Sequence, residues 1–218
     1  MKTPRSSSGS SAGPGSATAA GCVGFAIGTE TLGSISSPSS TNGVTGLRPT
    51  FGRVPRTGAM ALVWSMDKIG PMTRSVEDAA LVFGVLHGPD GRDLSCRVRE
   101  VVQQGPGAWP NTFRKAHLIP AVDYINANRV RAVAIARWAE LFRSVDVIVT
   151  PTGAANQLTA TNLTGHPACI LPNGFRDGTP INVSITFLGS LFGEANLLRV
   201  AHAYQQATGF HVRHPALA

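Results

Sequence analysis

The sequence predicts an α/β fold, and three segments carry that prediction. Residues 127–143 place their large apolar side chains, including Trp138, on one stripe of a helix and most charged residues elsewhere. Residues 145–151 follow directly as an apolar strand that ends in proline. Residues 183–187 alternate between apolar and polar side chains, which is typical of a half-buried strand. A helix that leads straight into a buried strand indicates stacked α and β layers.

The other elements are predicted from their local patterns. Residues 16–20 are small enough for a tightly packed helix that Gly21 would end. Residues 23–27 form a short apolar run, which predicts a buried strand. Ser75 and Asp78 have the spacing of a capping box, so a helix should follow Ser75 and stop at Gly88. Two later segments complete the set, namely an apolar run at 167–171 and an amphipathic helix at 194–207.

The chain length fits a single domain spanning residues 1–218. Residues 43–74 contain many glycines and prolines but are too apolar for a linker, so we expect them to wrap against the sheet. Residues 88–107 are the most polar stretch and predict a seam within the domain.

Composition excludes several classes of protein. The charge of +7 comes from 16 Arg and 3 Lys against 12 acidic residues, but the arginines are scattered, with the densest cluster at Arg92, Arg97 and Arg99. Nucleic-acid binding normally needs a basic stripe with aromatic residues between its charges, so no nucleic-acid partner is expected. No apolar run is long enough to span a membrane, and residues 1–10 do not have the pattern of a secretory signal.

The three cysteines also limit the chemistry. Cys22, Cys96 and Cys169 form an odd set without a CxxC motif, which predicts neither a disulfide framework nor a metal site. A reducing compartment fits such a chain, and we expect it to be cytoplasmic.

Two glycine-rich turns that carry serine, GSSAGPGS and TETLGSIS, are the candidate reactive site. A serine hydroxyl is a poor nucleophile near neutral pH and needs a neighbour that takes its proton. A second serine can relay that proton to a neutral lysine, while consecutive backbone N–H groups in a glycine turn stabilise the oxyanion. GSSAGPGS lacks the Gly-Lys-Ser/Thr of a nucleotide-binding loop, which argues against a phosphate site.

The order and spacing of these segments resemble the amidase signature family. The stretches that match over residues 5–80 are GSSAGPGSATAA, GFAIGTETLGSISSPSS, GVTGLRPTFGRVPRTG and DKIGPMTRSVEDAA. Later stretches are also similar, namely VDVIVTPT, NLTGHPACILPNGF, SITFLGSLFGEANLL and AYQQATGFH. The resemblance implies an α/β fold with a mixed β-sheet core flanked by helices. It also implies hydrolysis of a small-molecule carboxylic amide, with no metal and no organic cofactor.

The resemblance assigns a role to each matching residue. Ser34 takes the place of the nucleophile that forms the acyl intermediate, and Ser10 that of the bridging serine, which the family holds after a cis peptide. The backbone N–H groups of Thr31, Leu32, Gly33 and Ser34 would form the oxyanion hole. Thr29 and Ser11 are expected to support the two serines.

The chain departs from the family pattern at four points. Glu30, Leu32 and Ser36 stand where the family commonly has Asp, Gly and Arg. The family's catalytic lysine lies upstream of the bridging serine, and none of the lysines here, Lys2, Lys68 and Lys115, sits in a matching motif. We therefore expect a family member that is truncated at its N-terminus, shortened internally and without an identified catalytic lysine.

These departures leave alternatives to an active amidase. The chain could be a catalytically inactive remnant with a binding role, or a relative of an amidotransferase A subunit that needs a partner. A partner protein or a second copy could cover the face that truncation exposes. Two residues are interpreted as structural rather than catalytic: His166, which borders the expected substrate region, and Cys169, which lies in an apolar run.

Overall fold

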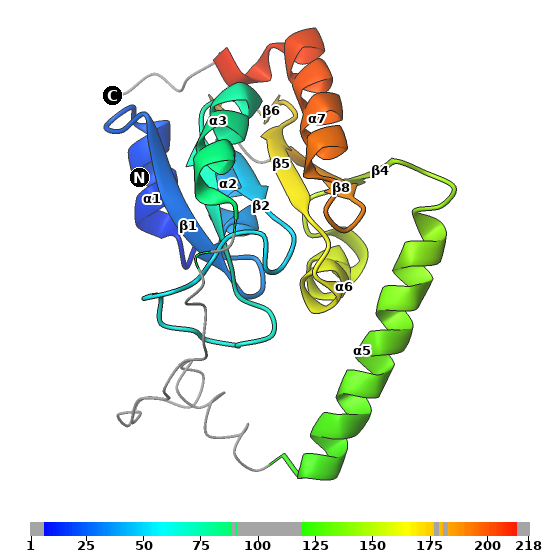
Figure 1. Ribbon diagram of the computed structural model, residues 1–218. Coiled ribbons are helices and arrows are strands. Elements are labelled where there is room, and N and C mark those ends of the chain that lie inside the picture. Colours follow the sequence, from blue (N-terminus) through cyan, green and yellow to red (C-terminus); the bar gives the residue numbers. More distant parts are fainter. Residues whose placement is uncertain (1–6, 89, 91–118, 177–178, 181–182, 213–218) are drawn as a thin grey trace.

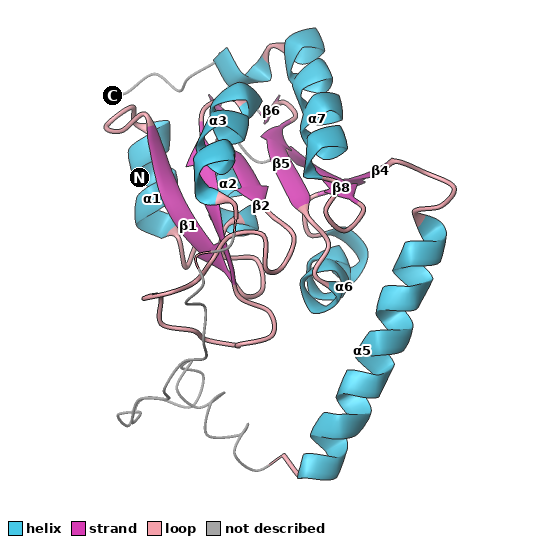
Figure 2. Cartoon of the chain, viewed as in Figure 1, coloured by secondary structure: helices cyan, strands magenta, loops and turns pink. Residues whose placement is uncertain are grey.

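A computed structural model of the chain describes residues 7–88, 90, 119–176, 179–180 and 183–212 (Figure 1). The predicted polar seam at 88–107 and the arginine cluster at 92–99 therefore lie almost entirely outside the described residues. A sheet forms the centre of the molecule, and helices lie around it (Figure 2).

Six strands make the main sheet, in the order β1-β3-β2-β5-β8-β4. Their bounds are β1 Phe25–Glu30, β2 Thr45–Arg48, β3 Lys68–Thr73, β4 Val147–Pro151, β5 Ala168–Pro172 and β8 Ser184–Gly189. A separate pair joins β6 Phe175–Arg176 to β7 Thr179–Pro180. The short 3₁₀ helices are η1 Ala154–Asn156 and η2 Phe210–Val212.

The expected α/β fold with helices flanking a sheet is confirmed, but the pairing differs in detail from a mixed sheet. All five pairings between the described strands of the main sheet are antiparallel. The reason lies in the helical crossovers from β1 to β2 and from β4 to β5. Each crossover joins two strands that run the same way, but a third strand, β3 or β8, lies between them and reverses both contacts.

Helices cover both faces of the sheet. α3 Val76–Leu86 and α7 Glu194–Thr208 lie over one face, on a core that includes Cys169 and Leu171 of β5. Ala168 and Ile170 of the same strand belong to a different cluster, with Trp138 of α5. Because successive side chains of a strand point to opposite faces, these two clusters lie on opposite sides of the sheet.

Three shorter helices complete the layers near the candidate site. α1 Ala12–Ala19 packs on β1 and β3, and α2 Ser36–Asn42 packs on β2 and β5. α6 Gln157–Thr164 precedes β5 and contacts α5. α1 confirms the predicted helix, although it begins four residues earlier than expected.

The prediction of a buried strand at 23–27 is wrong. β1 begins at Phe25 and is an edge strand among the described strands of the sheet. Phe25 and Ile27 are 50% and 39% exposed, whereas Gly28 and Glu30 on the opposite face are buried, so only one face of β1 is covered. The side chain that β1 does bury completely is the polar Glu30 at its end.

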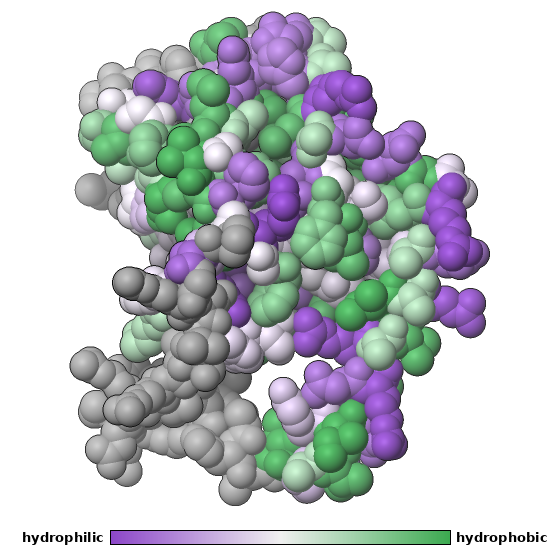
Figure 3. All heavy atoms as spheres, in the orientation of Figure 1, coloured by the Kyte–Doolittle hydropathy of each residue, from purple (hydrophilic) through white to green (hydrophobic). Residues whose placement is uncertain are grey.

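The helix predicted at 127–143 is α5 Ala121–Leu141, and its apolar stripe is only partly used. Trp138 and Phe142, at its end, pack on the sheet cluster and on the ring of His166, but no residue of α5 is fully buried. The first part of α5 stands away from the body in Figure 1, and apolar side chains reach the surface there in Figure 3. No helix within the described ranges has the length and apolar character needed to cross a membrane.

Candidate active site

A pocket of about 90 Å³, partly open to solvent, lies where the two serine turns meet the start of β3. Ser10 and Ser34 both line it, although they are 24 positions apart in the sequence. The other lining residues are Thr29, Thr31, Arg56, Ala59, Met60, Ala61, Leu62, Trp64, Asp67, Lys68 and Ile69. The structure therefore brings together the two serines that sequence analysis singled out.

Direct hydrogen bonds tie the first serine turn to the second. The peptide bond between Gly9 and Ser10 is cis, at the position that the resemblance implies. The backbone N–H of Ser11 donates to the carbonyl oxygen of Ser34 at 3.2 Å. The Ser11 hydroxyl accepts from the Thr29 N–H at 3.1 Å and donates to the Thr29 carbonyl at 3.2 Å. Ser11 thus fixes both β1 and the Ser34 turn, and Ser10 lines the pocket.

The turn at residues 32–34 presents backbone donors that have no acceptor. Among the described residues, none accepts a hydrogen bond from the N–H groups of Leu32, Gly33 or Ser34. Gly33 has φ +94°, a conformation that residues with a Cβ rarely adopt. Leu32 lies outside the positive-φ region, so its presence in place of the family's glycine requires no unfavourable backbone, and its side chain is 46% exposed.

The carboxylate of Glu30 fixes this turn through hydrogen bonds to the two residues that follow Ser34. Its Oε2 accepts from the N–H groups of Ile35 and Ser36 at 2.9 and 2.8 Å and from the Ser36 hydroxyl at 2.9 Å. Its Oε1 accepts from Arg48 and from the Asn162 amide, both at 2.8 Å. Burial alone would raise the pKa of the Glu30 carboxyl, but the Arg48 charge and these hydrogen bonds outweigh it and lower the pKa to about 2. Glu30 is thus a fully buried carboxylate that accepts five hydrogen bonds.

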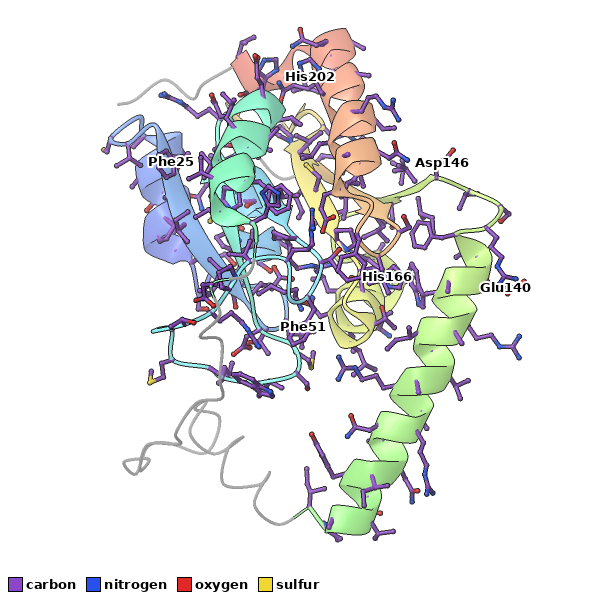
Figure 4. The ribbon with its side chains drawn as sticks, in the orientation of Figure 1. Phe25, Phe51, Glu140, Asp146, His166 and His202 are labelled. Carbon is purple, nitrogen blue, oxygen red and sulfur yellow. The ribbon has the colours of Figure 1, made fainter. Side chains whose placement is uncertain are left out.

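A loop between β2 and β3 forms the opposite wall of the pocket. Asp67 connects this loop to the turn that follows β1. Its carboxylate accepts hydrogen bonds from the Thr31 hydroxyl and from the N–H groups of Leu62 and Val63. The Arg56 guanidinium lies 4.4 Å from the Trp64 ring centroid and 4.7 Å from that of Phe51. Figure 4 labels Phe51 in this region. Stacking and ion-dipole contacts therefore hold the wall in place.

Lys68 is the lysine that the described part of the chain places in the pocket. It is the first residue of β3, lies opposite Glu30 in the β1–β3 register and is only 2% exposed. Its ammonium donates to the carbonyl of Met66. Burial and the charge of Arg48 lower the pKa of Lys68 to about 7, and the carboxylates of Glu30 and Asp67 offset only part of that effect.

His166 and Cys169 lie away from the pocket, among packed side chains. The His166 ring stacks on Phe142, with centroids 5.3 Å apart, and its Nδ1 is 2.8 Å from the Thr164 hydroxyl (Figure 4). Burial and the nearby Arg48 lower the pKa of His166 to about 4, so its ring is neutral at pH 7. Burial raises the pKa of the Cys169 thiol to about 12, which suits a core residue. Both positions agree with the structural interpretation of these residues.

Several residues that shape the site were missed by sequence analysis. Lys68, Asp67 and Arg56 were not assigned to it, and Glu30 was noted only as a departure from the family pattern. The antiparallel register that brings Lys68 opposite Glu30 left no signal in the local sequence. The described residues contain no group of three or more His, Cys, Asp or Glu side chains arranged to hold a metal ion.

Comparison with known proteins gives concordant matches. A family model described as Amidase matches residues 1–108. The A subunit of glutamyl-tRNA(Gln) amidotransferase from Marinobacter nauticus is 27% identical over 333 aligned residues, which cover 95% of this chain and 68% of the relative. The protein of the same name from Nitratidesulfovibrio vulgaris is 52% identical over 99 residues, or 45% of this chain and 20% of that protein.

The fold and the length can be compared in the same way. The crystal structure of an amidase family protein from Bacillus anthracis has a TM-score of 0.79 and 21% identity, over 97% of this chain and 62% of that one. This chain spans about two thirds of the length of such relatives. About 207 residues, which are 95% of the 218, are aligned over 333 positions, so about 126 of those positions (333 − 207) have no counterpart in this chain, and the chain is shortened internally relative to the Marinobacter protein. The resemblance to the amidase signature family is thus confirmed, since the Amidase family model matches residues 1–108 and proteins of that family align along most of the chain.

Proposed function

We propose that this chain is an amide hydrolase that works through an acyl-Ser34 intermediate. The observation that supports this most directly is that Ser10 and Ser34 line one pocket, beside a turn whose N–H groups have no acceptor in the described part of the chain. Preorganised donors of this kind stabilise the negative charge that develops on the carbonyl oxygen during attack.

The chemistry follows from this arrangement. The Ser34 hydroxyl attacks the amide carbonyl, and Ser10 receives its proton while passing its own proton on to a base. The N–H groups of the 31–34 turn hold the oxyanion, with Thr31, Leu32 and Gly33 as its donors together with Ser34 itself. The C–N bond then breaks as the amine leaves with a proton, and water hydrolyses the Ser34 ester. Thr29 and Ser11 support these serines through the hydrogen bonds between α1 and β1.

Labelling with a fluorophosphonate tests this proposal, because the probe reacts with an activated serine and models acyl transfer. Wild-type protein should be labelled at Ser34, Ser34→Ala should lose the label, and Ser10→Ala should be labelled at least about 10²-fold more slowly. Ser16→Ala is the matched control, because Ser16 is an exposed serine on α1 that donates only to backbone carbonyls. Labelling of wild type no faster than of Ser34→Ala would indicate a catalytically inactive protein with a binding role.

A second candidate function is that of an amidotransferase A subunit. It is favoured by the 52% identity to such a protein over the 99 residues of that match. In this case the chain would release ammonia from a carboxamide such as glutamine only when its partner proteins are present. Ammonia release by the purified chain alone, lost in Ser34→Ala, would count against this candidate and in favour of an independent hydrolase.

A further inference from the structure

The position of Lys68 relates it directly to the nucleophile turn. Lys68 and Glu30 are register partners in neighbouring antiparallel strands, and side chains of such partners project from the same face of the sheet. On that face, Glu30 accepts from the N–H groups of Ile35 and Ser36, the two residues after Ser34. The Lys68 side chain is therefore placed under the same turn, and it lines the pocket with Ser10 and Ser34.

The charges around Lys68 leave its amine without a dedicated counter-ion. Glu30 of β1 is paired with Arg48 of β2 at 2.8 Å, and the Asp67 carboxylate is occupied by the Thr31 hydroxyl and two backbone N–H groups. Arg131 of α5 adds a further positive charge near Lys68. Among the described residues, no carboxylate forms an ion pair with Lys68.

A buried lysine in such surroundings differs from a lysine that stabilises a fold by a salt bridge. A structural ammonium is normally matched by a carboxylate, since a buried charge without a partner is costly. Here the Glu30 carboxylate is paired with Arg48 and not with Lys68, so the unprotonated amine of Lys68 is favoured. A neutral amine that lines the same pocket as two serine hydroxyls is the kind of group that their proton transfer needs.

We propose that Lys68 is the general base of this site. The proposal rests on the acyl-Ser34 chemistry above and names the residue that accepts the proton. The Lys68 amine takes a proton from Ser10 as Ser10 takes one from Ser34, and the Ser34 oxygen forms its bond to the carbonyl carbon. The resulting ammonium returns a proton through Ser10 to the leaving nitrogen as the C–N bond breaks. Hydrolysis of the ester repeats the cycle, with water as the proton source.

The test compares the rate of fluorophosphonate labelling at Ser34 across pH 6–9 for wild type, Lys68→Met and Lys68→Arg. The wild-type rate should rise with pH through about 7 and then level off, because the fraction of neutral amine rises as the lysine loses its proton. Lys68→Met should be at least about 10²-fold slower, which is the usual contribution of a general base. Lys68→Arg should be equally slow, because a guanidinium keeps its proton at every pH in this range.

The two substitutions separate a base from a structural charge. Lys68→Arg retains the positive charge, so labelling at the wild-type rate in that variant would overturn the proposal and leave Lys68 a counter-charge. A Lys68→Met rate and pH profile equal to those of wild type would also overturn it, while the acyl-Ser34 proposal would stand. If wild type is labelled no faster than Ser34→Ala, the proposed function itself fails. Should both variants misfold in thermal denaturation, a wild-type rate without a rise near pH 7 still overturns the proposal.

Discussion

Among single residues, Glu30 has the largest structural role in the candidate site. It is fully buried, pairs with Arg48 and accepts hydrogen bonds from the two N–H groups that follow Ser34. Removing one partner of a buried ion pair leaves the other charge uncompensated, which typically costs about 3–5 kcal/mol. The geometry of the turn and the stability of the fold therefore depend on the same carboxylate.

Glu30→Gln should lower the free energy of unfolding by about 3–5 kcal/mol near pH 7. The pKa of Glu30 is lower in the folded state than the usual 4.5, so its stabilising effect is complete above pH 4.5 and disappears as pH falls toward 2. Urea denaturation at several pH values measures this, and the difference from wild type should shrink over that interval. Glu140→Gln is the control, because Glu140 forms an exposed pair with Arg143 and should change little. A difference that stays constant from pH 7 to pH 2 would contradict the assignment.

The sequence identified some residues of the site and not others, for a physical reason. Ser10, Ser34 and Gly33 lie in short motifs whose spacing can be compared directly. Lys68 and Asn162 join the site through strand register and through contacts that span up to 132 positions, as between Glu30 and Asn162. Such contacts depend on which strand lies beside which, and no local pattern encodes that.

At the scale of the elements, local sequence patterns predicted the bounds of single helices well and the burial of strands less well. The cap at Ser75 is confirmed, since its hydroxyl accepts from the Asp78 N–H at 3.0 Å, and α7 has nearly the predicted bounds. The apolar composition of β1 indicated burial, but the face that carries Phe25 and Ile27 is exposed. Which face of a strand is covered depends on how the helices pack on the sheet, and residues 23–27 do not specify that.

Ser75→Ala should lower the free energy of unfolding by about 1 kcal/mol, because the first turn of α3 loses the acceptor for an N–H group. Ser75→Asp retains an acceptor and should stay close to wild type. Equilibrium denaturation with urea gives both values, and an unchanged slope would show that the effect is on stability alone. If Ser75→Ala were as stable as Ser75→Asp, the cap would contribute nothing to this helix.

At the scale of the whole molecule, α5 differs from the other described α-helices in having no buried residue. Arg131 anchors it to the carbonyl oxygens of Ser65 and Leu163, and Trp138 anchors it to the sheet. Between and before these anchors, Val122, Val130 and Val133 are 60–66% exposed. Exposed apolar side chains gathered on one element favour association.

The purified chain should therefore self-associate as its concentration rises, and Val130→Glu with Val133→Glu should shift it toward monomer. Sedimentation velocity over a concentration series measures the change. Val85→Glu is the matched control, because Val85 is 86% exposed but lies on α3. If wild type stays monomeric throughout the series, the exposed apolar side chains of α5 do not drive association and the prediction is wrong.

The two walls of the pocket differ in how firmly they are tied to the core, and this difference determines which substitutions the protein can accept. The serine side is tied to the core through Glu30 and Ser11, so substitutions there put folding at risk. The facing side includes Met60, which is 79% exposed and contributes little to the core. Under the proposed function, substrate recognition and the reaction therefore fall to separate segments. Substitutions at residues 59–64 would then change which amides fit the pocket while the two serines stay in place, at small cost to the stability of the fold.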